Sequence, residues 1–161
     1  MNKFLILALL LLAGSTTSCL ESECGLNPTF SVVTEQHNAD ISAIDEFLNE
    51  NELEAQIHPS GVRYIINEGG SGDRPTLCDR VIVDYTGSLM LEGTVFEDPE
   101  EPASFALSTL IPGWQIGIPL INAGGNVTLF IPSTLAYGTQ ARDNIPANSI
   151  LRFDIELLAV N

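Results

Sequence analysis

Apolar and polar residues follow two different periods in two parts of the chain. In the segment 38–54 the apolar residues recur at i, i+3 and i+7 with acidic residues between them, which is typical of an amphipathic helix. Asn38 or Asp40 is expected to cap this helix. In the segment 150–160 apolar and charged residues alternate strictly, which predicts a strand with one buried and one exposed face.

Shorter apolar runs lie between these two segments, separated by turns rich in glycine and proline. They predict a short helix that opens near Pro112, and strands at 62–67, 80–85, 94–96, 103–107 and 127–131. Pro119 is expected to shorten the helix, because proline removes a backbone hydrogen bond. Several antiparallel strands with one short helix indicate the α+β class, and roughly 100 residues suit one domain.

The N-terminus has the pattern of a targeting segment. Lys3 precedes a wholly apolar run at 4–13, which is too short to span a bilayer because a spanning helix needs ~20 residues. Small and polar residues follow up to Cys19. We therefore expect a signal peptide at 1–18, an acidic tether at 19–38, the amphipathic helix and a linker at 39–58, and one domain at 59–161.

Cys19, placed directly after the small-residue stretch, resembles the cysteine of a bacterial lipobox. In such proteins this cysteine becomes the lipidated first residue of the mature chain. The resemblance implies an exported protein that a lipid at Cys19 anchors to the bacterial envelope membrane, on either its periplasmic or its surface side. An ordinary secreted protein cut nearby is the alternative.

The formal net charge is −15, with 6 Lys and Arg against 21 Asp and Glu. A basic patch cannot form, so we expect no nucleic-acid partner and no polybasic attachment to a membrane surface. The 3 Cys and 2 His are too few and too scattered for a structural zinc site. We expect neither a metal nor a cofactor.

The cysteine count predicts a disulfide. If lipid occupies Cys19, the two cysteines that remain are Cys24 and Cys78, and an even number outside the cytoplasm favours a bridge between them. In the alternative, Cys24 stays close to the membrane and Cys78 is a small buried apolar residue.

Four short motifs occur in order along the segment 59–161. They are VDYTG at 83–87, IPGW at 111–114, LAYG at 135–138 and IPAN at 145–148. Taken together they resemble the FKBP-type peptidyl-prolyl cis-trans isomerases. The resemblance implies a strongly bent antiparallel sheet wrapped around a short helix, here preceded by the amphipathic helix.

The resemblance also implies a role for each residue of the pocket motif. The indole of Trp114 would form the floor beneath a proline ring. The backbone N–H of Ile111 and the hydroxyl of Tyr137 would bind substrate carbonyls. The apolar walls and the rim would be formed by Tyr85, Phe96, Phe153, Leu110 and Ile145.

The chain departs from the family pattern at several positions. Glu97 stands where the family usually has aspartate, and Asp98 follows it, so either carboxylate is a candidate for the acidic residue of the site. Ala103 replaces a pocket phenylalanine, which would open one wall. Phe105 and Phe130 fall outside the pocket motif and are expected to pack in the core.

A pocket with almost no titratable group suits prolyl isomerisation, because no covalent bond is made or broken. The barrier is the loss of amide resonance, ~18–20 kcal/mol, and a dry apolar cleft favours the twisted amide over the planar one. We therefore expect an isomerase that acts on proline-containing polypeptides in the envelope and binds macrolide inhibitors weakly. The alternatives are a non-catalytic FKBP-like binding or chaperone module and a purely structural surface lipoprotein.

Overall fold

The structure, a computed structural model, describes residues 34–161. The expected signal peptide, the lipidation site Cys19 and the disulfide candidate Cys24 lie outside the described residues. The helices of the described part are α1 (Glu35–Glu50), α2 (Pro112–Gly117) and the short 3-10 turns η1 (Leu107–Thr109), η2 (Ile118–Leu120) and η3 (Ser133–Leu135). The strands are β1 (Gln56–Ile57), β2 (Arg63–Glu68), β3 (Arg80–Leu89), β4 (Val95–Glu97), β5 (Ala103–Ala106), β6 (Gly125–Ile131) and β7 (Leu151–Val160).

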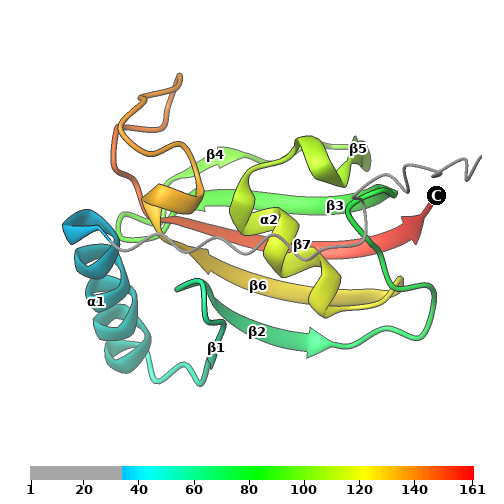
Figure 1. The fold of residues 1–161 in the computed structure, drawn as a ribbon, viewed down its shortest axis with the longest axis horizontal. Helices are drawn as coiled ribbons and strands as arrows, with labels where there is room; N and C mark the ends of the chain where they lie inside the picture. Colours follow the sequence, from blue (N-terminus) through cyan, green and yellow to red (C-terminus); the bar gives the residue numbers. More distant parts are fainter. Residues whose placement is uncertain (1–33) are drawn as a thin grey trace, which may run out of the picture.

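The seven strands form one sheet in which every neighbouring pair is antiparallel (Figure 1). The order is β1-β2-β6-β7-β3-β4, and β5 also pairs with β3. The long strands β3 and β7 are paired from Val81 opposite Val160 to Leu89 opposite Leu151. Strands β4 and β5 follow one another along the other edge of β3. The expected α+β fold with a single antiparallel sheet is confirmed.

Helix α2 lies across one face of the sheet and covers the main core (Figure 1). The strictly alternating strand β7 turns Leu151, Phe153 and Ile155 towards this face, as its sequence pattern predicts. The helix approaches β6 closely at Gly113, where an added Cβ atom would lie 2.5 Å from the side chain of Ile131. Glycine is therefore needed at this position to bring α2, and with it Trp114, down onto the sheet.

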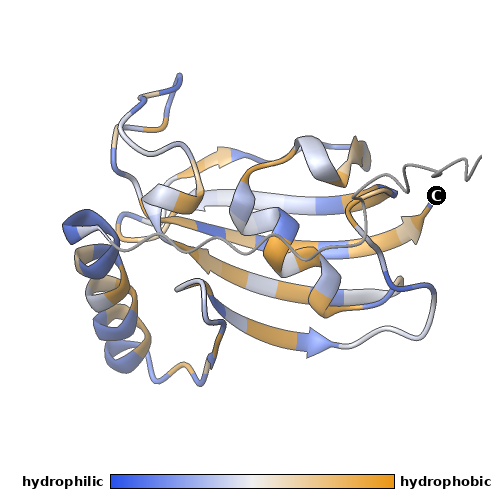
Figure 2. Cartoon of the chain, in the orientation of Figure 1, coloured by the Kyte–Doolittle hydropathy of each residue, from blue (hydrophilic) through white to orange (hydrophobic). Residues whose placement is uncertain are grey.

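Helix α1 packs against a second apolar cluster at one end of the molecule. Its Ile44 and Leu48 are buried against Phe130 and Met90, and its apolar stripe faces the sheet (Figure 2). The core position expected for Phe130 is confirmed by its exposure of 0%. An ion pair adds to this packing.

The ion pair joins α1 to β2. The guanidinium of Arg63 donates to both carboxylate oxygens of Asp45, at 2.8 and 2.9 Å, and to the carbonyl of Gly61 at 2.9 Å. The Arg63 side chain is only 7% exposed, whereas that of Asp45 is 50% exposed. The buried charge is thus satisfied by a partner that remains in contact with water.

The boundaries of α1 differ from the expectation. The helix begins at Glu35, inside the segment expected as tether, because the side chain of Thr34 accepts a hydrogen bond from the His37 N–H at 3.1 Å and caps it. The prediction that Asn38 or Asp40 caps the helix is wrong. The carboxylate of Asp40 instead accepts hydrogen bonds from Ser133, which is 93 residues away in the sequence. The α2 helix ends at Gly117, just before Pro119, as predicted.

Cys78 is disulfide-bonded. Its expected partner, Cys24, lies outside the described residues, so the Cys24–Cys78 pairing stays a prediction. Within residues 34–161, none of the helices has the length and apolar character needed to cross a membrane.

Candidate active site

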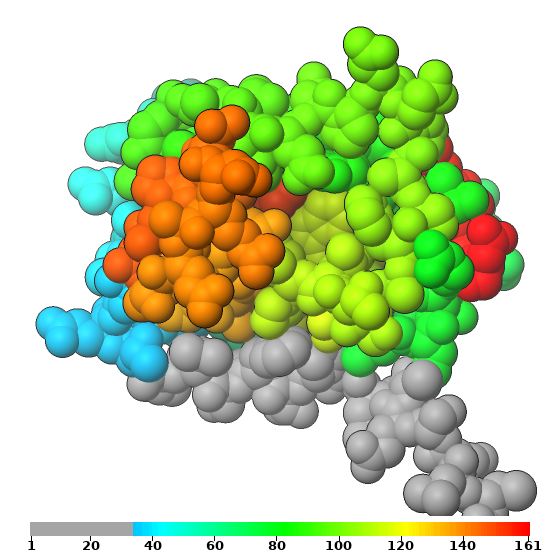
Figure 3. Space-filling model, turned by 90° about the horizontal axis from the view of Figure 1, so that it is seen from above, coloured from blue at the N-terminus to red at the C-terminus, as the bar shows by residue number. Residues whose placement is uncertain are grey.

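An apolar pocket of about 180 Å³ lies between α2, the inner face of the sheet and the loop after η3. In the space-filling view it opens between the orange loop that follows η3 and the yellow-green segment around α2 (Figure 3). Its lining consists of Tyr85, Glu97, Phe105, Leu110, Ile111, Trp114, Tyr137 and Phe153.

Trp114 forms the floor of the pocket and is held by aromatic neighbours on several sides. Its ring meets Tyr85 at 5.0 Å and 87°, Phe153 at 5.1 Å and 89°, and Phe105 at 6.0 Å and 84°. These edge-to-face contacts each contribute about 0.5–1.5 kcal/mol beyond area burial. The indole is only 4% exposed, and its Nε1–H has no hydrogen-bond partner in the described part of the chain.

The lining of the pocket includes one carboxylate, that of Glu97. The Tyr85 hydroxyl donates to Glu97 Oε1 at 2.7 Å. Burial, followed by the hydrogen bond and the charge of Glu97, raises the pKa of Tyr85 well above its usual value. The extra methylene of Glu97 therefore does not prevent this carboxylate from reaching the pocket tyrosine.

Asp98 belongs to the other face of the sheet. Its Oδ1 accepts a hydrogen bond from the Thr86 hydroxyl at 2.8 Å, and Thr86 points away from the core because it follows Tyr85 on β3. Between the two candidates for the acidic residue, only Glu97 lines the pocket.

Two polar groups at the pocket are available to a ligand. Neither the backbone N–H of Ile111 nor the hydroxyl of Tyr137 donates a hydrogen bond to another residue of 34–161. The guanidinium of Arg142 lies 4.8 Å from the centre of the Tyr137 ring. Burial and the charge of Glu97 raise the pKa of Tyr137, and Arg142 lowers it in part, so the hydroxyl stays protonated at neutral pH.

The structure brings most of the predicted site residues together. Phe96 stands behind the pocket wall, with its ring 5.7 Å from that of Phe153. Ile145 is 8% exposed and belongs to the main core beside the pocket. The catalytic and substrate-binding roles of all these residues stay predictions.

Phe105 packs against the main core, as expected, but it also has a place in the pocket that was not expected. Phe105 lines the pocket and lies between Tyr85 and Trp114, 6.1 and 6.0 Å from their rings. The signal was present in the sequence, because Phe105 lies two residues after Ala103 on the same strand and so shares its face. Phe105 supplies part of the pocket wall, whereas Ala103 does not line the pocket.

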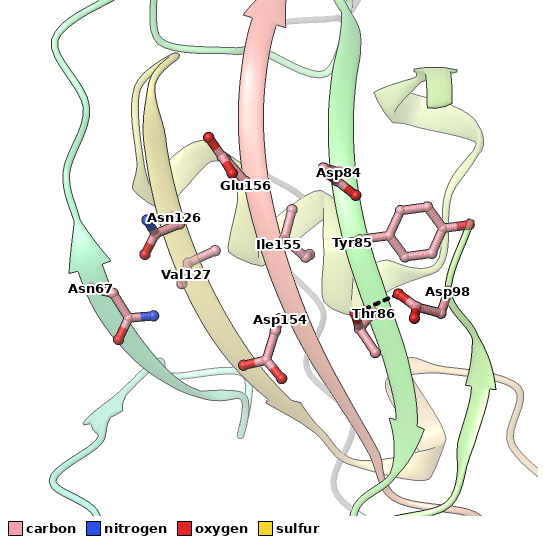
Figure 4. Close-up of a pocket in the computed structure, with 10 residues that line it drawn as sticks. All are labelled: Asn67, Asp84, Tyr85, Thr86, Asp98, Asn126, Val127, Asp154, Ile155 and Glu156. Carbon is pink, nitrogen blue, oxygen red and sulfur yellow. Dashed lines mark hydrogen bonds between the residues drawn. The ribbon is translucent and has the colours of Figure 1, made fainter. Parts of the chain in front are cut away.

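A larger hollow of about 420 Å³ lies on the opposite, polar face of the sheet. Its carboxylates belong to Asp84 on β3, Asp154 and Glu156 on β7, and Asp98 just after β4. The Thr86–Asp98 hydrogen bond lies at its edge (Figure 4). Among residues 34–161 there is no cluster of His, Cys, Asp and Glu that could hold a metal ion. This hollow lacks the apolar lining that the predicted chemistry needs.

The antiparallel sheet, the helix across its inner face and the aromatic pocket between them define an FKBP-like domain. A family model described as FKBP-type peptidyl-prolyl cis-trans isomerase matches residues 72–158. The chain belongs to this family.

Relatives support the assignment. The FKBP-type peptidyl-prolyl cis-trans isomerase FkpA of Aeromonas hydrophila is 45% identical over 104 residues, which cover 63% of this chain and 38% of that protein. The outer membrane protein MIP of Legionella longbeachae is 40% identical over 122 residues, which cover 72% of this chain and 52% of that protein. The chain thus spans about half or less of the length of these curated relatives.

The fold agrees with a solved structure. The crystal structure of FkpA from Escherichia coli superposes with a TM-score of 0.69 at 39% sequence identity, covering 76% of this chain and 60% of that one. The expected FKBP-like architecture is therefore confirmed.

Proposed function

We propose that this chain is a peptidyl-prolyl cis-trans isomerase that assists protein folding in the bacterial envelope. The observation that carries the proposal is the small aromatic pocket with Trp114 at its floor and two unbonded polar groups, the Ile111 N–H and the Tyr137 hydroxyl, beside it. Family membership supports the same activity.

The pocket suits rotation about an X-Pro bond better than it suits bond-breaking chemistry. A proline ring seated on Trp114 would leave its imide bond in apolar surroundings. The twisted transition state loses charge separation on the carbonyl, so a dry site binds it better than the planar ground state. The Ile111 N–H and the Tyr137 hydroxyl would hold the flanking carbonyls while the bond turns.

A binding module without turnover is the alternative, since Ala103 would widen the pocket. Phe105 weighs against this alternative, because its ring occupies the wall and contacts both Tyr85 and Trp114. Ala103 itself is paired with Val83 inside the sheet and does not line the pocket.

Catalysed refolding separates the two functions. Prolyl isomerisation takes about 10–100 s at 25 °C and limits the refolding of many proteins. The isomerase proposal predicts that the mature chain accelerates such a slow phase at one molecule per many client molecules. Acceleration that needs one molecule per client, or simple retention of the unfolded client, would favour the binding module.

The size of the pocket bears on its ligands. About 180 Å³ is below the ~300–1,000 Å³ that sites for drug-sized ligands occupy. Proline-containing polypeptides, which insert one ring, are the substrates that we propose. Only part of a macrolide inhibitor would fit into this pocket, so its binding is proposed to be weak.

Envelope anchoring through Cys19 is a separate proposal. It is supported by the apolar segment 4–13, the small residues before Cys19 and the relative named outer membrane protein MIP. Cys19→Ser should move the protein from the membrane fraction to the soluble fraction or leave the signal uncut. An unmodified N-terminus at or after Cys19 in the mass spectrum would remove the lipid anchor from the account, but not the isomerase.

The Cys24–Cys78 disulfide is proposed on two grounds, the cysteine count and the disulfide-bonded state of Cys78. It would tie the segment before α1 to the start of β3. In the chain-entropy model a loop of this length stabilises by roughly 4 kcal/mol. Peptide mapping of the unreduced mature protein should yield a linked pair containing both cysteines, and a linked pair containing Cys19 would contradict both this bridge and the lipid anchor.

A further inference from the structure

The first turns of α1 hold the segment η3 through a buried carboxylate. Asp40 is 3% exposed, and its Oδ2 accepts hydrogen bonds from the backbone N–H of Ser133 at 2.8 Å and from its hydroxyl at 2.5 Å. The other oxygen, Oδ1, accepts from Gln36 Nε2 at 2.7 Å. Burying a carboxylate is unfavourable unless such donors satisfy it, so this arrangement is specific rather than incidental.

Ser133 in turn closes the turn that carries Tyr137. Its carbonyl accepts hydrogen bonds from the backbone N–H groups of Ala136 at 3.0 Å and Gly138 at 2.8 Å. Tyr137 lies between these two residues, and its ring lines the pocket. A continuous chain of hydrogen bonds therefore leads from α1 to the backbone on both sides of Tyr137.

A second contact of α1 fixes the same segment. His37 is 4% exposed, and its Nδ1 lies 2.7 Å from the hydroxyl oxygen of Thr134. The other side of the imidazole packs on Gly61, which has a φ of +98° and where an added Cβ atom would lie 2.6 Å from Nε2. The start of α1 thus contacts both the turn before β2, through Gly61, and η3, through Thr134.

We propose that Asp40 is a positioning residue of the isomerase site, which acts through Ser133 to place the hydroxyl of Tyr137. This inference rests on the proposed function. It means that α1, which precedes all four family motifs, helps to position a residue of the isomerase site. Misplacement of a binding group by about 1 Å can cost up to ~10²-fold in rate.

The rest of α1 has its own attachment to the sheet, so a change at Asp40 need not detach the helix. Ile44 and Leu48 are buried in the second apolar cluster, and Asp45 pairs with Arg63. Asp45 therefore offers a matched control, because it is an aspartate on the same helix that ties α1 to β2 without touching η3.

The test is a double-mutant cycle on the full mature chain. Asp40→Ala removes the acceptor of Ser133, and its kcat/KM should fall about as far as that of Tyr137→Phe. When Tyr137 is already Phe, adding Asp40→Ala should change kcat/KM by less than about twofold, because the two residues act as one unit. Asp40→Asn should restore most of the activity, since its carbonyl oxygen can still accept from Ser133 while the exposed Gln36 turns to solvent.

Asp45→Asn should lower the urea midpoint but leave kcat/KM unchanged. Full additivity of Asp40→Ala and Tyr137→Phe, or an equal loss of activity in Asp45→Asn, would overturn the positioning role.

A spectroscopic readout keeps this inference separate from the proposed activity. The chain has 3 Tyr, so ring resonances of protein labelled on tyrosine can be assigned by substitution. Asp40→Ala should shift the Tyr137 ring signals and leave those of Tyr64 in place, whereas Asp45→Asn should leave Tyr137 unchanged. If the wild type lacks isomerase activity but this shift occurs, the proposed function fails and the placement of Tyr137 by Asp40 stands. An unchanged Tyr137 signal in folded Asp40→Ala would refute the placement itself.

Discussion

The structure makes a sharp prediction about which of two neighbouring acidic residues serves the pocket. Glu97 accepts the hydroxyl of Tyr85 at 2.7 Å inside the pocket, whereas Asp98 accepts that of Thr86 at 2.8 Å on the outer face. We expect Glu97→Ala to lower isomerase activity, because the Tyr85 ring loses the bond that fixes it against Trp114. Asp98→Asn, a change next to it in sequence, should leave the activity unchanged.

The expected size of the effect follows from the exposure of Glu97. A hydrogen bond to a charged group contributes about 1.5–3 kcal/mol. Glu97 is exposed, so water can replace the carboxylate as acceptor when it is removed, and the net loss should be smaller, about 1 kcal/mol. If the loss appears fully in the transition state, kcat/KM falls about fivefold. Glu97→Gln, which keeps a neutral acceptor, should fall between the wild type and Glu97→Ala.

Steady-state isomerisation of one X-Pro peptide, with urea unfolding measured in parallel, is sufficient to test this prediction. The tyrosine contribution can be separated in the Tyr85→Phe background, where Glu97→Ala should have almost no further effect. The reasoning is refuted if Asp98→Asn loses as much activity as Glu97→Ala. It is equally refuted if Glu97→Ala, correctly folded, keeps the wild-type rate.

Three further predictions concern the tyrosines and the helix–sheet contact. Tyr137→Phe should lower kcat/KM several-fold, while the free energy of unfolding from urea titration stays within about 0.5 kcal/mol of the wild type, because the hydroxyl has no hydrogen-bond partner in residues 34–161. A clear loss of stability would contradict this free hydroxyl. The pKa values of Tyr85 and Tyr137 are higher in the folded protein than in the unfolded chain, so their contribution to the free energy of unfolding is complete below about pH 10 and is lost as the pH rises above it. The loss should be shallower in Tyr85→Phe. A free energy of unfolding that rises with pH in this range would contradict the prediction. Gly113→Ala should lower the free energy of unfolding, because overpacking on Ile131 costs about 1–3 kcal/mol and the gain in helix propensity is only ~0.5–1 kcal/mol. Gly69→Ala, which has open space around it, should be nearly neutral in the same urea titration.

The local patterns of the sequence were sufficient for the sheet and for most of the pocket. Strict alternation at 150–160 predicted the inner face of β7, including Phe153. The four motifs occur in the order found in the FKBP family, and this resemblance placed Tyr85, Trp114 and Tyr137 around one pocket, as the structure has them. These features depend on neighbours in sequence or on one strand.

The features that the sequence did not reveal depend on contacts between distant residues. Asp40 had the residue type of a helix cap, but its carboxylate is used by Ser133, 93 residues away in the chain, and Thr34 caps the helix instead. Phe105 was assigned to the core because it falls outside the pocket motif. The pocket uses Phe105, which lies two residues after Ala103 on the same face of β5, and its contact with Trp114 shows this role.

The most direct test of the account measures the exchange between the cis and trans forms of an X-Pro peptide by nuclear magnetic resonance, with catalytic amounts of the mature protein. The account predicts faster exchange in proportion to protein concentration, nearly constant across neutral pH, and a marked loss when Trp114 is replaced by Leu in a variant that remains folded. Exchange at the spontaneous rate for every X-Pro peptide, with the wild-type domain shown to be folded, would contradict the claim that this aromatic pocket is an isomerase site.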